Sequence, residues 1–249
     1  MFRILSFVFI LTLSASAFAG HIIVNNDDFP LSNTGFVNAG ATNTTNFAQN
    51  AALYLTGVSS GAAIWLDSDN LSLAQSDLQG ALSAYTLTDT GFSAFTLATL
   101  QNYRAVFLGG DNLTSAEQAA LIAYINGGGG VYIAAGTGAI GNDTAAAEAA
   151  QWNAVINTFQ LSLASVYNGF TGDIATNGSN PILNGVAQLY YNNGNSVSST
   201  GPNGQIITTN QGQGLIGIYN PTAAVPEPST MLLVAGALAG LGLYRRNRS

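Results

Sequence analysis

Residues 103–138 read YRAVFLGGDNLTSAEQAALIAYINGGGGVYIAAGTG, and this stretch decides the fold class. Ala105–Leu108 is a short apolar run of the kind found in strands buried on both faces, and Gly109-Gly110-Asp111 follows it as a turn. Thr114 and Glu117 then have the spacing of a capping box, in which two side chains satisfy backbone N–H groups at a helix start. The stretch therefore predicts a strand, a tight turn and a helix in close succession.

The following residues repeat this pattern. Gly127–Gly130 ends the helix, and Val131–Ala135 has the composition of a second buried strand. Asp143 or Thr144 then caps an Ala-rich helix, whose large apolar side chains recur at helical spacing as far as Phe159. Strands and helices that alternate through short links indicate parallel crossovers. We therefore expect an α/β fold with a doubly wound, mostly parallel sheet and helices on both faces.

The same alternation extends toward the N-terminus and changes toward the C-terminus. His21–Asn26 and Ala62–Leu66 read as strands, with a helix from Asn46 to a C-cap at Gly57 between them. Residues 72–101 are ambiguous. Beyond Leu161 the pattern becomes strand-rich, with strands expected at 189–191, 205–208 and 215–219.

The N-terminus has the composition of a secretory signal peptide. Arg3 supplies the positive charge, Ile4–Leu13 is an apolar run, and Ala17-Phe18-Ala19 is a small-residue cleavage signal before Gly20. We expect cleavage after Ala19; an uncleaved anchor and a buried core helix are the alternatives.

The C-terminus has three parts in a fixed order. Val225-Pro226-Glu227-Pro228-Ser229 comes first, an apolar run follows, and Arg245, Arg246 and Arg248 close the chain. A helix from Pro228 to Tyr244 would be roughly 26 Å long, near the lower limit for crossing a bilayer. Arginines prefer the cytoplasmic side, which would leave the middle of the chain outside.

This tail resembles the PEP-CTERM protein-sorting signal. The resemblance implies export in a Gram-negative, exopolysaccharide-producing bacterium, with transient residence in the inner membrane and delivery to the cell surface or matrix. It also implies an exosortase as partner, which recognises Val225–Ser229 and cleaves near Pro-Glu-Pro; a plain membrane anchor is the alternative. The expected organisation is a signal peptide at 1–19, an exported α/β domain at 20–222 and the sorting signal at 223–249.

Composition excludes several classes of function. Between residues 20 and 225 the chain has one basic residue, Arg104, and eleven acids, which gives a net charge of about −10. Nucleic acid is therefore excluded as a partner, because binding phosphates needs basic contacts. The absence of cysteine excludes disulfides and thiol chemistry, and the single histidine, His21, lies beside the expected cleavage site.

Residues 103–138 also resemble class I glutamine amidotransferase-like domains, and Asn180–Val186 (NPILNGV) is similar to a stretch in such folds. In that family the catalytic cysteine lies in the turn after the second strand, where this chain has Thr137. The resemblance therefore implies the scaffold of that family without its activity.

The acids at strand ends form the candidate ligand site. Ligands of open α/β sheets bind at the carboxyl ends of the strands. There we expect five acids, favoured as solvated strand-end and cap residues, with a weak Ca²⁺ site as the alternative and no other cofactor: Asp27, Asp28, Asp67, Asp69 and Asp111.

Three functions remain open at this stage. The first is a non-catalytic binding or structural module at the cell surface or in an exopolysaccharide matrix, with no catalytic residues. The second is an extracellular glycan hydrolase that uses two of the strand-end carboxylates. The third is a calcium-dependent adhesin.

Overall fold

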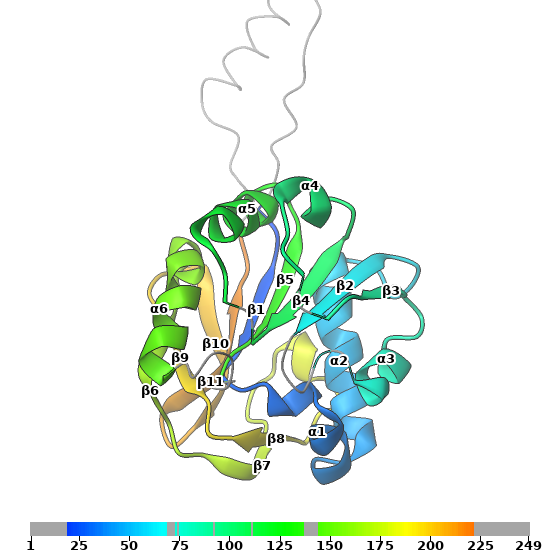
Figure 1. The fold of residues 1–249 in the computed structure, drawn as a ribbon. Helices are drawn as coiled ribbons and strands as arrows, with labels where there is room; N and C mark the ends of the chain where they lie inside the picture. The colour runs from blue at the N-terminus through cyan, green and yellow to red at the C-terminus, as the bar shows by residue number, and fades with distance from the viewer. Residues whose placement is uncertain are drawn as a thin grey trace, which may run out of the picture. The chain divides into compact units, whose positions relative to one another are not determined.

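The structure is a computed structural model that describes residues 19–68, 73, 75–91, 93–110, 112–136 and 144–221. Within these ranges nine strands form one sheet, and the two strands β7 (Thr171–Ala175) and β8 (Gln188–Asn192) pair separately. The described residues belong to one compact unit, Phe18–Thr222. The fold is a mixed α/β fold (Figure 1).

Five strands of the large sheet run parallel, in the order β3-β2-β4-β5-β1. Their bounds are β1 Ile22–Asn25, β2 Ala63–Ser68, β3 Thr86–Asp89, β4 Ala105–Gly109 and β5 Gly130–Ala134. Every residue of β1, β4 and β5 is buried, as expected for central parallel strands covered on both faces.

The rest of the sheet is antiparallel. β11 (Gln213–Tyr219) pairs with β1 on one side and with β10 (Gly204–Asn210) on the other. β9 (Asn195–Ser199) joins β11 at Gly214, and β6 (Leu161–Tyr167) pairs with β9. The sequence pattern predicted the strand-rich character of this region and the positions of β8, β10 and β11.

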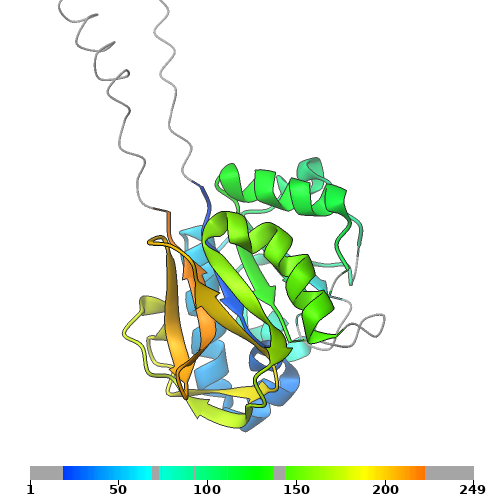
Figure 2. The same ribbon diagram turned by 90° about the vertical axis from the view of Figure 1, so that its left-hand side faces the viewer.

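Helices cover both faces of the sheet (Figures 1 and 2). One core contains side chains of α1 (Asn33–Asn38), α2 (Ala41–Thr56) and α3 (Ser76–Ala81). The opposite core contains side chains of α4 (Leu97–Leu100), α5 (Ser115–Asn126) and α6 (Ala145–Ile156). Ile23 belongs to the first core and its neighbours Ile22 and Val24 to the second, as alternation along a strand requires. The described ranges also contain three short 3₁₀ helices: Phe29–Leu31, Asn157–Phe159 and Pro181–Leu183.

The helix ends follow local chemistry. The capping box predicted at Thr114 and Glu117 is present at the start of α5, and Thr144 caps α6. α2 ends as predicted at Gly57, whose φ of 72° is left-handed. It begins at Ala41, earlier than Asn46, because its buried face includes the polar Thr44, whose hydroxyl donates to the carbonyl oxygen of Gly35.

The two ends of the described chain lie at one edge of the sheet. Ile22 at the start of β1 pairs with Tyr219 at the end of β11, beside the amino ends of the parallel strands. Among the described residues no helix is long and apolar enough to cross a membrane. The apolar run expected to do so, 228–244, lies outside the described residues.

Candidate functional site at the carboxyl end of strand β1

The carboxyl end of β1 lies at a point where the connections diverge. β1 and β5 are parallel neighbours. The chain leaves β1 toward α1 and α2 on one face, whereas the next helix after β5 is α6 on the other face. In open α/β sheets, ligand sites form at such divergence points.

Asp27, just beyond the end of β1, is fully buried and hydrogen-bonded. Its Oδ1 accepts from the backbone N–H of Phe29 at 3.0 Å, and its Oδ2 accepts from the backbone N–H of Asn192 in β8. Burial raises the pKa of Asp27 to about 6, although these hydrogen bonds act in the opposite direction. Asp27 therefore connects the end of β1 to a segment 165 residues later.

Asp28 has a different environment. It is 2 % exposed, and apart from the carboxyl of Asp27 no group in the described part of the chain hydrogen-bonds to its carboxylate oxygens. Burial raises its pKa to about 8, and the charges of Asp27 and Glu148 act in the same direction. Burial and the proximity of the two carboxyls therefore both raise the pKa of this pair above the ordinary range of Asp.

Two tyrosines lie beside this pair on the face covered by α2. The amide nitrogen of Asn25 donates to the hydroxyl of Tyr132 at 3.1 Å. Burial raises the pKa of both Tyr132 and Tyr191, and Asp27 raises each further. Both hydroxyls therefore stay protonated. Tyr132 also stacks on Phe107 at a centroid distance of 5.0 Å, which fixes its ring.

A second polar group, which we call the acceptor cluster, consists of Asn26, Asp28 and Asn195. The carbonyl oxygen of Asn26 accepts from the backbone N–H of Asn195 at 2.8 Å. The side-chain nitrogen of Asn195 donates to the carbonyl oxygens of Ala145 (3.0 Å) and Ala164 (2.8 Å). The cluster thus lies where β1, β9 and the start of α6 meet.

The strand order of the sheet separates acids that the sequence analysis predicted to lie together. Asp27 and Asp28 are adjacent, but Asp67 is on β2, and β4 and β5 lie between β2 and β1. At about 4.8 Å per strand, this places Asp67 roughly 14 Å away. Its Oδ1 accepts from the backbone N–H of Ser93 at 3.0 Å. Asp69 and Asp111 lie outside the described residues.

In the described part of the chain, no three acidic, histidine or cysteine side chains form a metal-ligand group. Any cation there would have to be bound largely by amide oxygens. His21 lies at the opposite edge of the sheet, at the start of β1, and its ring packs against Tyr54 at 4.5 Å. Thr137, Ala17 and the sorting-signal residues are outside the described residues; Ala19 and Gly20 are inside, and the backbone N–H of Gly20 donates to Ile125.

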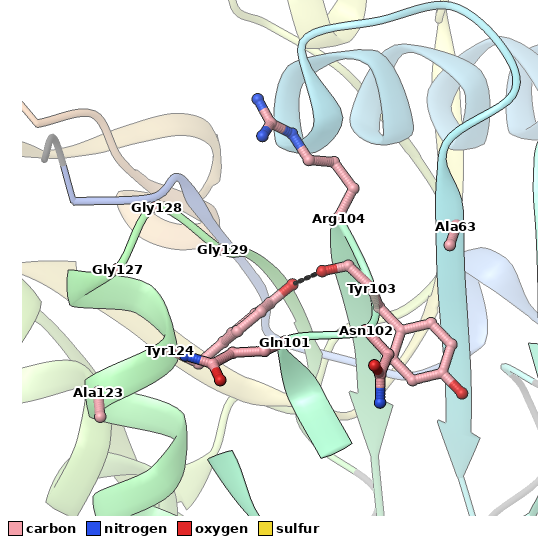
Figure 3. A pocket seen from close by; sticks show the side chains of 10 residues that line it. All are labelled: Ala63, Gln101, Asn102, Tyr103, Arg104, Ala123, Tyr124, Gly127, Gly128 and Gly129. Atoms are coloured by element: carbon pink, nitrogen blue, oxygen red, sulfur yellow. Dashed lines mark hydrogen bonds between the residues drawn. The ribbon is translucent and has the colours of Figure 1, made fainter. Parts of the chain in front are cut away.

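A pocket of about 380 Å³ lies at the amino edge of the sheet, lined in part by Tyr103, Arg104 and Tyr124 (Figure 3). The Tyr124 hydroxyl donates to the carbonyl oxygen of Tyr103 at 3.0 Å. The Arg104 side chain points away from both rings, and its Nε donates to the carbonyl oxygen of Thr56, the last residue of α2. Arg104 therefore caps a helix. Gly129 packs tightly against Tyr124, since a Cβ at Gly129 would lie 2.2 Å from the Tyr124 ring.

Sequence reasoning missed several residues around the Asp pair, namely Asn25, Asn26, Tyr132, Glu148, Tyr191 and Asn195. The signal for two of them was present, because Asn25 and Asn26 directly follow the apolar run of a strand that is buried throughout. Amides in such a position must find partners or ligands. Asn195 had no comparable signal, since β9 is polar and short.

Comparison with known proteins identifies the tail only. Residues 224–248 match the PEP-CTERM protein-sorting motif, in agreement with the resemblance of the C-terminal sequence. No curated protein and no solved structure matches the chain. The amidotransferase-like resemblance of residues 103–138 therefore receives no support from known structures.

Proposed function

We propose that this exosortase-targeted, exported chain acts at the cell surface or in the exopolysaccharide matrix as a non-catalytic binding or structural module. The observation that carries the proposal is the sorting motif at residues 224–248. The motif indicates export and delivery toward the cell surface, and exosortase processing would release the domain from its temporary position at the inner membrane.

The arrangement of the ends supports a binding role at the opposite edge. Gly20 and the start of β1 lie beside the end of β11, so both connections leave the domain at the amino edge of the parallel strands. The Asp27–Asp28 pair lies at the carboxyl edge. Within the described domain, the carboxyl edge lies opposite the edge at which the described chain begins and ends.

Composition supports the matrix environment. The expected mature chain has only one basic residue, Arg104, so its net charge of about −10 keeps it soluble and separate from other acidic polymers. Contact with an exopolysaccharide would then use neutral amide and hydroxyl groups, or cations shared between the two.

Localisation of sorting variants in the native host tests this proposal. Replacing Pro226, Glu227 and Pro228 together by Ala should leave the chain in the inner-membrane fraction, because the exosortase recognition site is lost. The matched control is Pro221→Ala, which lies outside residues 224–248 and should be delivered normally. Normal surface delivery of the triple variant, or of the wild-type chain in a strain without exosortase, would contradict the proposal.

One observation favours a glycan hydrolase as second candidate. The raised pKa values of Asp27 (about 6) and Asp28 (about 8) are those of a carboxyl pair that could donate a proton at neutral pH. Turnover of a polysaccharide from a panel, lost in both Asp27→Asn and Asp28→Asn but kept in Asp173→Asn, would establish this activity. An absence of turnover across the panel would leave the binding module as the function.

A further inference from the structure

The acceptor cluster contains buried polar atoms that nothing in the described chain satisfies. Apart from the carboxyl of its neighbour Asp27, nothing in the described chain hydrogen-bonds to the carboxylate oxygens of Asp28, and both side-chain polar atoms of Asn26 and the Oδ1 of Asn195 have no hydrogen-bond partner. Asn26 and Asn195 are 0 % exposed, and Asp28 is 2 % exposed. Each unsatisfied buried polar group costs roughly 1–3 kcal/mol, so such a concentration calls for a partner that the described chain does not supply.

Three observations place these residues in one neighbourhood. Asn26 lies on the face covered by α6, because Ile22 and Val24 of the same strand pack in the core on that face. Asn195 is bonded to the backbone of Asn26, and its amide nitrogen reaches Ala145 in the first turn of α6. The charge of Glu148, also in that first turn, acts on Asp28.

The cluster contains far more acceptors than donors. Its unsatisfied atoms are four oxygens, which accept hydrogen bonds or bind cations, and one nitrogen, the Nδ2 of Asn26. The Oδ1 of Asn195 is held in place, since both hydrogens of its amide nitrogen are used by Ala145 and Ala164. A fixed set of oxygens beside two acidic side chains is complementary to a positive charge.

The ligand type selects the cation. Carboxylate and amide oxygens are ligands of hard cations, and Ca²⁺ accepts mixtures of them together with water. Zinc and copper prefer imidazole or thiolate groups. The chain has no cysteine, and its one histidine, His21, lies at the other edge of the sheet.

We propose that Asp28, Asn26 and Asn195 bind a calcium ion, with Glu148 as a neighbouring negative charge. The ion would connect the end of β1, the start of β9 and the first turn of α6, which are far apart in the sequence. It would complete the domain outside the cell, where calcium is abundant enough for a weak site. This inference does not depend on exosortase processing and holds for either candidate function.

Thermal unfolding of the full chain, purified in detergent and treated with EDTA, tests the site. At 10 mM CaCl₂ the Tm should rise by about 3–5 °C relative to NaCl of equal ionic strength, as expected for a dissociation constant near 1 mM. The Asp28→Asn and Asn26→Ala variants should show no calcium-dependent rise. Both should fold, because Asn has nearly the same size and shape as Asp and Asn26 makes no side-chain hydrogen bond in the described structure.

Asp173→Asn is the matched control, because it removes one negative charge from an exposed position in β7. It should keep the calcium-dependent rise. An unchanged Tm in the wild-type chain would mean that water alone occupies the cluster, and an equal rise in wild type, Asp28→Asn and Asn26→Ala would mean nonspecific screening of the acidic surface. Either result would overturn the proposal.

Discussion

At the scale of single residues, adjacent positions in the sequence have opposite environments. Asp27 accepts two backbone hydrogen bonds, whereas Asp28 accepts none in the described structure. The sequence predicted that both would lie at a strand end, because they follow an apolar run. It could not predict this difference, since one partner of Asp27 is Asn192, which only the tertiary fold brings close.

His21 provides a prediction at this scale. Burial lowers its pKa below 6.5, although a hydrogen bond to the backbone of Tyr219 acts in the other direction. The neutral ring of His21 therefore makes its full contribution to the free energy of unfolding above pH 6.5, and this contribution is lost as the pH falls below that value. Because the ring is only half-buried, the loss should be less than about 1 kcal/mol.

Chemical denaturation of wild type and His21→Gln at several pH values measures this effect. As the pH falls from 6.5 to 5, the free energy of unfolding of the wild type should decrease relative to that of His21→Gln. A difference that does not change with pH would show that protonation of His21 is not coupled to folding.

At the scale of elements, local signals predicted the central unit well, and in the C-terminal part they predicted β8, β10 and β11 but not β6, β7 and β9. The β4–α5–β5 unit has a capping box, apolar strands and a glycine stop, all readable within a few residues. In contrast, β7 and β9 are polar and expose alternate or terminal residues; β7 pairs only with β8, and β9 lies between β11 and β6. Without apolar periodicity, their existence depends on distant partners.

Gly194→Ala tests how closely the end of β1 and the start of β9 approach each other, and Gly80→Ala in α3 is the control. A Cβ at Gly194 would lie 1.8 Å from the carbonyl oxygen of Asn26, so Gly194→Ala should destabilise the domain by about 2–3 kcal/mol. A Cβ at Gly80 in α3 meets nothing within 4 Å. Gly80→Ala should therefore stabilise it by about 0.5–1 kcal/mol, through lower backbone entropy in the unfolded chain.

Urea unfolding of the two variants gives both values directly. Equal small effects of Gly194→Ala and Gly80→Ala would mean that the close approach of β9 to the end of β1 is not part of the folded state.

At the scale of the whole molecule, the chain combines a compact acidic domain with a C-terminal sorting motif. The sorting motif, the mixed α/β fold and the large sheet were all predicted from the sequence, because each depends on local composition or on alternation of strands and helices. The grouping of the candidate acids was not predictable in detail, since the order of strands decides which strand ends are neighbours. Strand order placed Asp67 apart from Asp27 and Asp28.

The intact mass of the protein recovered from the surface or matrix of its native host tests the central claim most directly. We predict a chain that begins at Gly20 and ends near Pro226–Pro228, without Arg245, Arg246 and Arg248. Recovery of the unprocessed chain of 25.5 kDa, with both ends intact and outside the membrane fraction, would contradict the account.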